Sequence, residues 1–230
     1  YFFMEYQGGQ NNYENSETHD TVIVKVEMET CKLVAYSKPL KLGHSNDGCY
    51  NPRTGLITVA YCGKNGETGE ARYNRACFID PETLELVGEE ALPLAFYAIS
   101  YNAYTGQYIL ARGGINFAVL NEDFSLSHKV TTDFNETFGK TVVPDCVVGT
   151  DVITQGIDCD SKYVYFVLST HSGTNYLLAF RYDGTLAFTK EVPGAPKEIE
   201  NIFHIGSVMY VSYNGNYNGV KRPCYRLTID

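Results

Sequence analysis

Val26-Glu-Met-Glu-Thr-Cys-Lys-Leu-Val34 and Ile79-Asp-Pro-Glu-Thr-Leu-Glu-Leu-Val87 align without a gap. Each segment has an apolar start, an acidic turn that ends in Glu-Thr, and a second half in which apolar and polar residues alternate. Alternation with a period of two is typical of a β-strand with one buried face, so each segment predicts a hairpin. The recurrence of this hairpin along the chain predicts a repeat architecture.

A second type of hairpin alternates with the first. Asp47-Gly-Cys-Tyr-Asn-Pro-Arg-Thr-Gly-Leu-Ile-Thr-Val-Ala60 and Ala98-Ile-Ser-Tyr-Asn-Ala-Tyr-Thr-Gly-Gln-Tyr-Ile-Leu-Ala111 share the motif Tyr-Asn-x-x-Thr-Gly. In this motif the Gly closes a tight turn before an apolar strand. Looser copies lie at 156–167 and 202–211. Interleaving the two hairpin types gives units of about 50 residues with four strands each, which is the signature of a propeller blade.

We therefore predict an all-β chain, a five-bladed β-propeller of four-stranded antiparallel blades in one domain. The blades are expected at about 1–43, 44–94, 95–147, 148–197 and 198–230. Innermost strands are expected near 45–50, 96–101, 154–159 and 200–205. The first blade then has no innermost strand and the last has no outermost strand, so both are incomplete. We expect either a truncation that removed the missing segment before Tyr1, or closure of the ring by an unrepeated device. The alternative is a β-sandwich with Greek-key connections.

Composition excludes several classes of function. The 230 residues carry a formal net charge of −9, which disfavours binding to nucleic acid or to anionic membranes. No apolar run approaches the roughly 20 residues that span a bilayer. The seven cysteines are an odd number without a CxxC pair or metal-ligand spacing, so free thiols are expected rather than disulfides or a metal site.

Three segments carry a likeness to a known family, namely Gly43-His-Ser-Asn-Asp47, Gln155-Gly-Ile-Asp158 and Glu200-Asn-Ile-Phe-His204. With its Asn-Pro-x-Thr-Gly turn, the chain resembles the bacterial YVTN- or NHL-like propeller repeats, and most closely secreted or surface-attached domains of Gram-positive bacteria. This resemblance implies an extracellular or cell-surface location. A cytoplasmic location is the alternative, because the chain does not begin with a signal peptide. The resemblance does not specify a function, since such propellers serve in binding, scaffolding and catalysis.

A candidate ligand site follows from the repeat. Alignment of the innermost strands puts four polar residues at equivalent positions, namely Asn46, Tyr97, Gln155 and Asn201, with Glu200 as the alternative to the last. These residues are expected to ring the mouth of the central channel and to bind a small polar ligand such as a sugar or an ion. Tyr217, in a loop that alternates Tyr with Asn and Gly, is expected to contribute by stacking. The alternative is a hydrated polar plug without a ligand.

Catalytic candidates are Asp47, Glu200 and His44, because paired carboxylates can cleave glycosides. Alternation along a strand points Asn46 and Asp47 to opposite faces, which weakens this idea. His204, between Phe203 and Ile205, is expected to be a core histidine. No metal site and no cofactor are expected. Calcium is the one ion that the acids of Asp158-Cys-Asp160 and Asn121-Glu-Asp123 leave open, although such acids usually cap their own turn.

The sequence thus favours a non-catalytic binding module that recognises a carbohydrate, a cell-surface ligand or a protein partner at the channel mouth. An enzyme resembling a glycoside hydrolase or lyase is the first alternative, and a structural spacer domain is the second.

Overall fold

The computed structural model describes residues 2–7, 20–61, 63, 68, 71–135, 139, 141–143, 152–170, 172–192, 198–213, 216–217, 220–221 and 224–227. Apart from a helical stretch at residues 139, 141 and 142, the regular structure of this part is β-strand. None of its helices is long and apolar enough to cross a membrane. The chain divides into two compact units, Tyr1–Tyr97 and Ala98–Asp230.

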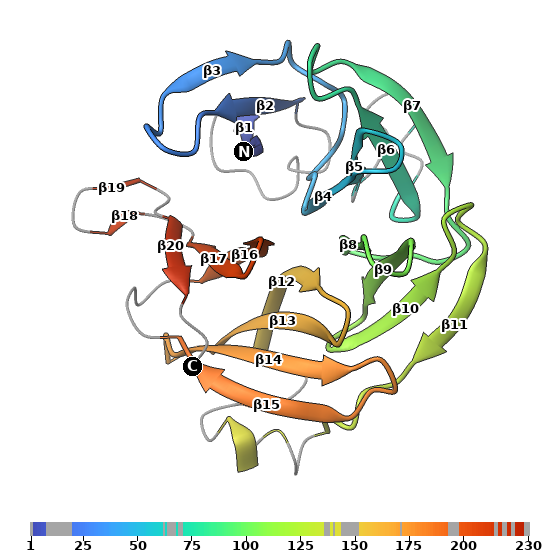
Figure 1. Cartoon of the computed structure of the whole chain (residues 1–230), viewed down its shortest axis with the longest axis vertical. Coiled ribbons are helices and arrows are strands. Elements are labelled where there is room, and N and C mark those ends of the chain that lie inside the picture. The colour runs from blue at the N-terminus through green and yellow to red at the C-terminus, as the bar shows by residue number, and fades with distance from the viewer. Residues whose placement is uncertain are drawn as a thin grey trace. The chain divides into compact units, whose positions relative to one another are not determined.

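The first unit holds two antiparallel sheets (Figure 1). One has the order β1-β2-β3 and the other the order β4-β5-β6-β7. The strands are β1 (Phe2–Gln7), β2 (Asp20–Val26), β3 (Leu33–Tyr36), β4 (Gly48–Asn51), β5 (Leu56–Ala60), β6 (Arg75–Ile79) and β7 (Leu86–Ala91).

The second unit holds two four-stranded sheets, with the orders β8-β9-β10-β11 and β12-β13-β14-β15, a sheet β16-β17-β20 and the hairpin β18-β19. The strands are β8 (Ala98–Asn102), β9 (Gln107–Arg112), β10 (Asn116–Leu120), β11 (Leu126–Val130), β12 (Val152–Cys159), β13 (Tyr163–Thr170), β14 (Asn175–Arg181), β15 (Leu186–Glu191), β16 (Ile199–Ile205), β17 (Val208–Tyr213), β18 (Asn216–Tyr217), β19 (Val220–Lys221) and β20 (Cys224–Leu227).

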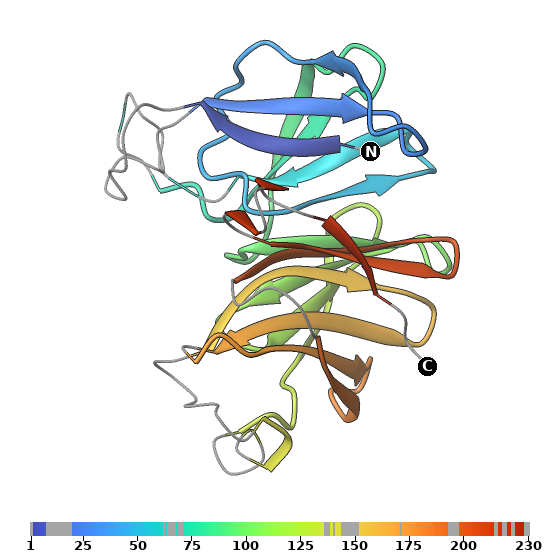
Figure 2. The same ribbon diagram turned by 90° about the vertical axis from the view of Figure 1, so that its left-hand side faces the viewer.

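Neighbouring sheets of the second unit meet along their first strands. β12 contacts β8 on one side and β16 on the other (Figure 1), and the 90° view shows the β16–β17 hairpin beside β12 (Figure 2). Three successive antiparallel sheets joined in this way form a propeller-like arrangement rather than a two-sheet sandwich. The predicted all-β class and the antiparallel four-stranded sheets are confirmed.

The outer hairpin turns repeat the same backbone conformation. Cys31 and Leu84, which are equivalent in the two aligned segments, have φ values of 53° and 58°. Phe124 (φ 62°) and Gly184 (φ 91°) close the corresponding turns of the next two sheets. Non-glycine residues seldom adopt positive φ, so its recurrence supports the repeat found in the sequence.

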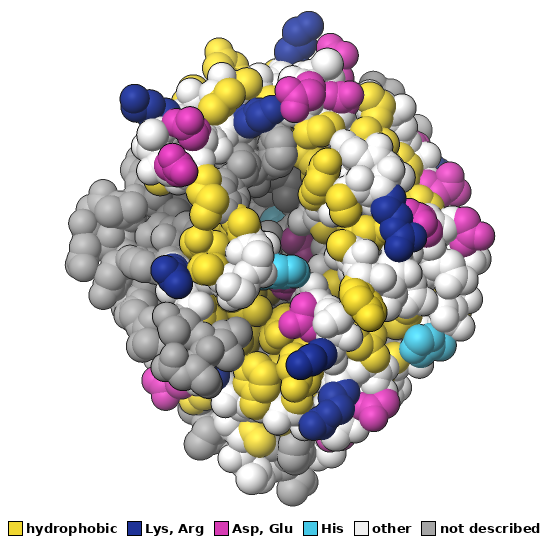
Figure 3. All heavy atoms as spheres, viewed as in Figure 1, with side chains coloured by type: hydrophobic (Ala, Val, Ile, Leu, Met, Phe, Trp, Pro, Cys, Tyr) yellow, Lys and Arg dark blue, Asp and Glu magenta, His cyan; other side chains and the backbone are white. Residues whose placement is uncertain are grey.

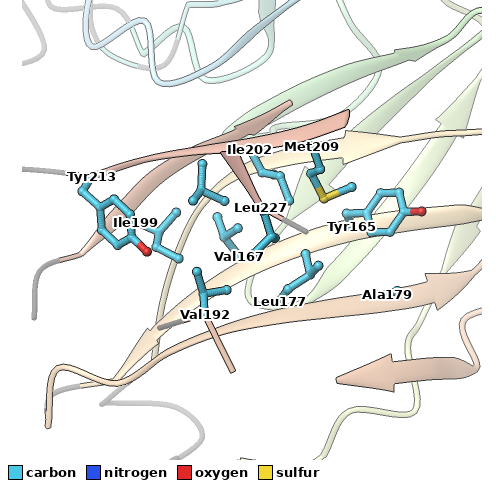
Figure 4. Packing of buried hydrophobic residues seen from close by; sticks show 11 residues of the cluster. Tyr165, Val167, Leu177, Ala179, Val192, Ile199, Ile202, Met209, Tyr213 and Leu227 are labelled. Atoms are coloured by element: carbon cyan, nitrogen blue, oxygen red, sulfur yellow. The ribbon is translucent and has the colours of Figure 1, made fainter. Parts of the chain in front are cut away.

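The core lies between neighbouring sheets. In the second unit a cluster joins β13 and β14 to β16, β17 and β20 (Figure 4). Val167 and Leu177 belong to this cluster together with Ile202 and Val211, and all four side chains are buried. Burial of each apolar side chain of this size stabilises the folded state by about 1.5–3 kcal/mol. The outermost strands are largely exposed, β7 and β11 in particular. The buried cluster therefore packs the sheet β12-β13-β14-β15 against the sheet β16-β17-β20.

Candidate functional site

The first strands of the three sheets in the second unit bring Ser100, Asp158 and His204 together. His204 Nδ1, on β16, lies 2.6 Å from Asp158 Oδ2, on β12. On the other side, Ser100 Oγ, on β8, donates a hydrogen bond to Asp158 Oδ1 at 3.3 Å. The backbone N–H of Cys159 donates to the same oxygen at 2.8 Å. The Asp158 carboxylate thus links three successive sheets.

The two members of the Asp158–His204 pair differ in exposure. Asp158 is buried, with 7% of its surface exposed. The side chain of His204 is 36% exposed. Since Nδ1 is occupied by Asp158, Nε2 is the ring nitrogen left for a ligand, and it has no hydrogen-bond partner among the described residues. The pair therefore combines a fixed, buried carboxylate with an imidazole that can reach a ligand.

Each member of the pair changes the proton affinity of the other. The hydrogen bond from Nδ1–H to the Asp158 carboxylate raises the pKa of His204 above its ordinary value of 6.5. Burial raises the pKa of Asp158 above its ordinary value of 3.8, and the bond to His204 opposes that increase. The imidazolium form of His204 is thereby stabilised in place.

A second acid, Asp160, lies two residues further on and has a different role. Its Oδ1 accepts hydrogen bonds from the backbone N–H groups of Lys162 (2.6 Å) and Tyr163 (2.8 Å), which close the turn before β13. Its Oδ2 accepts a hydrogen bond from Tyr165 Oη at 2.7 Å. Both carboxylate oxygens of Asp160 therefore serve the fold, as expected for an acid that caps its own turn.

Cys159 and Ser100 are both buried next to the Asp158 carboxylate. Cys159 Sγ lies 3.2 Å from Ser100 Oγ. Burial, followed by the nearby Asp158 charge, raises the pKa of the Cys159 thiol well above its usual range. This thiol therefore stays protonated and is a poor nucleophile.

β12 and β16 approach very closely beside the pair. A Cβ atom on Gly156 would lie 2.6 Å from Asn201 Oδ1 and 2.8 Å from Asn201 Cα, so a larger residue cannot be accommodated without movement. Next to this contact, Gln155 Nε2 donates a hydrogen bond to Glu198 Oε1 at 2.7 Å. The close contact fixes the spacing of the two strands that carry Asp158 and His204.

The four residues of the predicted ring divide between the units. In the first unit, Asn46 Nδ2 donates a hydrogen bond to the backbone oxygen of Tyr97 at 3.0 Å, so these two residues do meet. In the second unit, Gln155 and Asn201 lie on adjacent strands at the Gly156 contact. Tyr217 belongs to β18, and its side chain lies outside the described residues.

The catalytic candidates from the sequence are placed as follows. Asp47 is 1% exposed, and its Oδ1 accepts a hydrogen bond from the Gly48 N–H at 2.8 Å. His44 is half-buried in the first unit, and Glu200 is half-buried on β16 in the second unit. A residue that touches substrate must be accessible, so the burial of Asp47 argues against its proposed role.

The sequence analysis missed the pairing of Asp158 with His204. The prediction that His204 is a core histidine was wrong, because the structure leaves about a third of its side chain exposed. One signal was present. Asp158 stands two residues before the turn-capping Asp160, where the other copies of the hairpin have Ser100 and Cys49. Because a charged side chain is seldom buried without a partner, this strand position indicated that Asp158 would be paired.

Metal and disulfide chemistry find little support in the part of the chain that is described. It contains no group of three or more His, Cys, Asp or Glu side chains that could hold a metal ion. Cys31, Cys77 and Cys159 are free thiols.

Comparison with known proteins identifies relatives in structure only. No protein-family model matches the chain, and no curated protein matches its sequence. Among solved structures, Myxococcus xanthus glutaminyl cyclase aligns with a TM-score of 0.54 and 10% identity over 100% of this chain and 98% of that one. A protein of unknown function from Bacteroides caccae aligns with a TM-score of 0.48 and 12% identity over 90% of this chain and 68% of that one. The RRP9 WD40 repeats align with a TM-score of 0.44 and 9% identity over 91% and 76%. The similarity to the cyclase supports a β-propeller fold.

Proposed function

We propose that this chain is a propeller-type binding module that holds a small polar ligand, of carbohydrate class, against the first strands of the sheets in its second unit. The observation that carries the proposal is the orientation of His204 by the buried Asp158 carboxylate, with Nε2 left for a ligand. A side chain held in this way loses little conformational freedom when it binds.

The charges on these strands favour a neutral ligand with hydroxyl groups over an anion. β8, β12 and β16 contain no Lys or Arg, whereas Asp158 and Glu200 lie on them and Glu198 and Asp160 directly adjoin them. These four carboxylates outnumber the one cation on the strands, the His204 imidazolium, so they disfavour an anionic ligand. Hydroxyl groups can both donate to carboxylates and amide oxygens and accept from amide N–H groups such as that of Gln155.

The finer features expected from the sequence belong to this proposal. A five-bladed ring, with an incomplete first and last blade, is supported by the repeat of about 50 residues in the sequence. The YVTN- or NHL-like family and a location outside the cell are supported only by the segments that carry the resemblance, such as Gln155-Gly-Ile-Asp158.

The test is a binding screen of the whole chain on an array of neutral glycans, followed by calorimetry with any glycan retained. We expect the parent to bind, and His204→Gln to lower the affinity by at least about tenfold, as for loss of one strong hydrogen bond. His128→Gln is the matched control, because His128 is an exposed histidine on the outermost strand β11. The proposal fails if the parent binds no neutral glycan, or if the His204 variant binds as tightly as the His128 variant.

An enzyme is the second candidate function, and the Asp158–His204 pair is the observation that favours it. One protein that aligns over the whole chain is named a glutaminyl cyclase, and at 10% identity that name carries no substrate over to this chain.

A further inference from the structure

We propose that the ligand site is also catalytic, with His204 as a general base and acid and Asp158 as its positioning residue, and that it hydrolyses an ester or amide of the bound ligand by direct attack of water. The inference rests on the proposed ligand site in the second unit.

The geometry supplies what proton transfer by an imidazole requires. A carboxylate on Nδ1 holds the ring in the tautomer that has its lone pair on Nε2, and it stabilises the imidazolium that forms when Nε2 takes a proton. The Nδ1–Oδ2 distance of 2.6 Å places Asp158 to do this, and Ser100 with the Cys159 N–H holds the carboxylate from its other oxygen. Asp158 thus holds the His204 ring through Nδ1, while part of the ring stays exposed to solvent.

The same contacts exclude the nearby side chains as nucleophiles. Ser100 is 3% exposed, and its hydroxyl donates to Asp158 rather than to His204 Nε2. Cys159 is 1% exposed and its thiol is held protonated by burial. A nucleophile must lie within hydrogen-bond reach of its base, and neither residue meets that condition. The base therefore acts on water.

The reaction then balances without a cofactor. His204 Nε2 takes one proton from water as the water oxygen forms a bond to the carbonyl carbon. The bond from that carbon to the leaving oxygen or nitrogen breaks, and its electron pair stays on the leaving atom. The imidazolium gives its proton to that atom, which releases an alcohol or amine and a carboxylic acid. Asp158 keeps its charge throughout.

Among the residues that the structure describes, two charged groups act on His204, and both come from the end of β12. Asp158 is bonded to the ring and Asp160 acts on it through its charge, and both raise the pKa of His204. The rate of a base-catalysed step rises with pH as His204 loses its proton, so the midpoint of that rise reports the pKa of His204.

The experiment measures hydrolysis of p-nitrophenyl acetate by the whole chain between about pH 5 and pH 9. We expect the parent to exceed His204→Gln by at least about tenfold, and His128→Gln to match the parent. Asp158→Asn should lower the rate and also move the rise to lower pH, a shift that a merely structural role would not produce. Mass spectrometry should find no acetyl group on Ser100 or Cys159.

A parent rate equal to that of His204→Gln, or a pH profile that Asp158→Asn leaves in place, overturns the inference. Glycan binding by the same preparations separates this failure from failure of the ligand site, because binding without hydrolysis leaves the binding module intact. Should His204→Gln unfold, carbethoxylation of the folded parent by diethyl pyrocarbonate replaces it. Modification of His204 must then abolish hydrolysis, and modification of His128 must not.

Discussion

Two positions of each first hairpin differ in how uniform their side chains are. One is the turn residue that ends the first strand, and the other is the strand residue two positions before it. At the turns, Asn51, Asn102 and Asp160 all accept two backbone hydrogen bonds through Oδ1. Two residues earlier the side chains are Cys49, Ser100 and Asp158, which share no chemistry. The turn residue is therefore required by the hairpin, whereas the strand position is left open to site-specific use.

On the face drawn in Figure 3, acidic and basic side chains are interspersed rather than gathered into one patch of a single sign. The charge on this face therefore does not single out a site. The contrast between Asp158 and Asp160 does single out a site. Asp160 caps the turn of its hairpin, whereas Asp158 binds His204, a contact that the hairpin does not require.

The largest effect is expected where β12 meets β16. Gly156→Ala should destabilise the chain by about 2–3 kcal/mol, since the new Cβ would overlap Asn201 and force the two strands apart. Urea unfolding followed by circular dichroism measures this. Gly88→Ala is the control, because its Cβ would meet Phe78 at an ordinary 3.5 Å, and a comparable loss in both variants would contradict the account.

A smaller loss of stability is expected when the turn residue Asp160 is replaced. Asp160→Ala should cost about 1–2 kcal/mol, because it removes the acceptor of two backbone N–H groups and of the Tyr165 hydroxyl. Asp160→Asn should cost less than about 0.5 kcal/mol, since Asn51 and Asn102 fill the same role. Thermal unfolding of the two variants tests this, and equal losses would show that the carboxylate charge of Asp160 matters to the turn.

The pairing of Asp158 with His204 predicts that the stability of the fold depends on pH. The pKa of His204 is raised by folding, so its stabilising contribution is complete below its ordinary value of 6.5 and is lost as pH rises through the folded value. The free energy of unfolding should thus fall between neutral and mildly alkaline pH, by at most about 1.4 kcal/mol per pH unit for one proton. His204→Gln should flatten this fall in urea titrations at several pH values, and an unchanged slope would assign it to other groups.

The fold was largely predictable because local patterns determine it. β12 was predicted near 154–159 and spans Val152–Cys159, and β16 was predicted near 200–205 and spans Ile199–Ile205. The hairpin formed by β18 and β19 was missed, since two-residue strands carry no periodic signal. The expected ring of Asn46, Tyr97, Gln155 and Asn201 stays a prediction as a whole.

The site was less predictable because it depends on which strands become neighbours. Asp158 and His204 are 46 residues apart and belong to different sheets. Alternation within β16 could show that His204 faces away from Phe203 and Ile205, but not that a carboxylate from β12 would meet it. Packing between the sheets decides that contact.

The most direct test of the account is the titration of the His204 ring, followed by NMR in the parent, in Asp158→Asn and in Asp160→Asn. We predict that the pKa of His204 lies above its ordinary value in the parent, falls clearly in Asp158→Asn and changes much less in Asp160→Asn. A His204 that titrates alike in the parent and in Asp158→Asn would show that the two side chains are not paired, and would contradict the account.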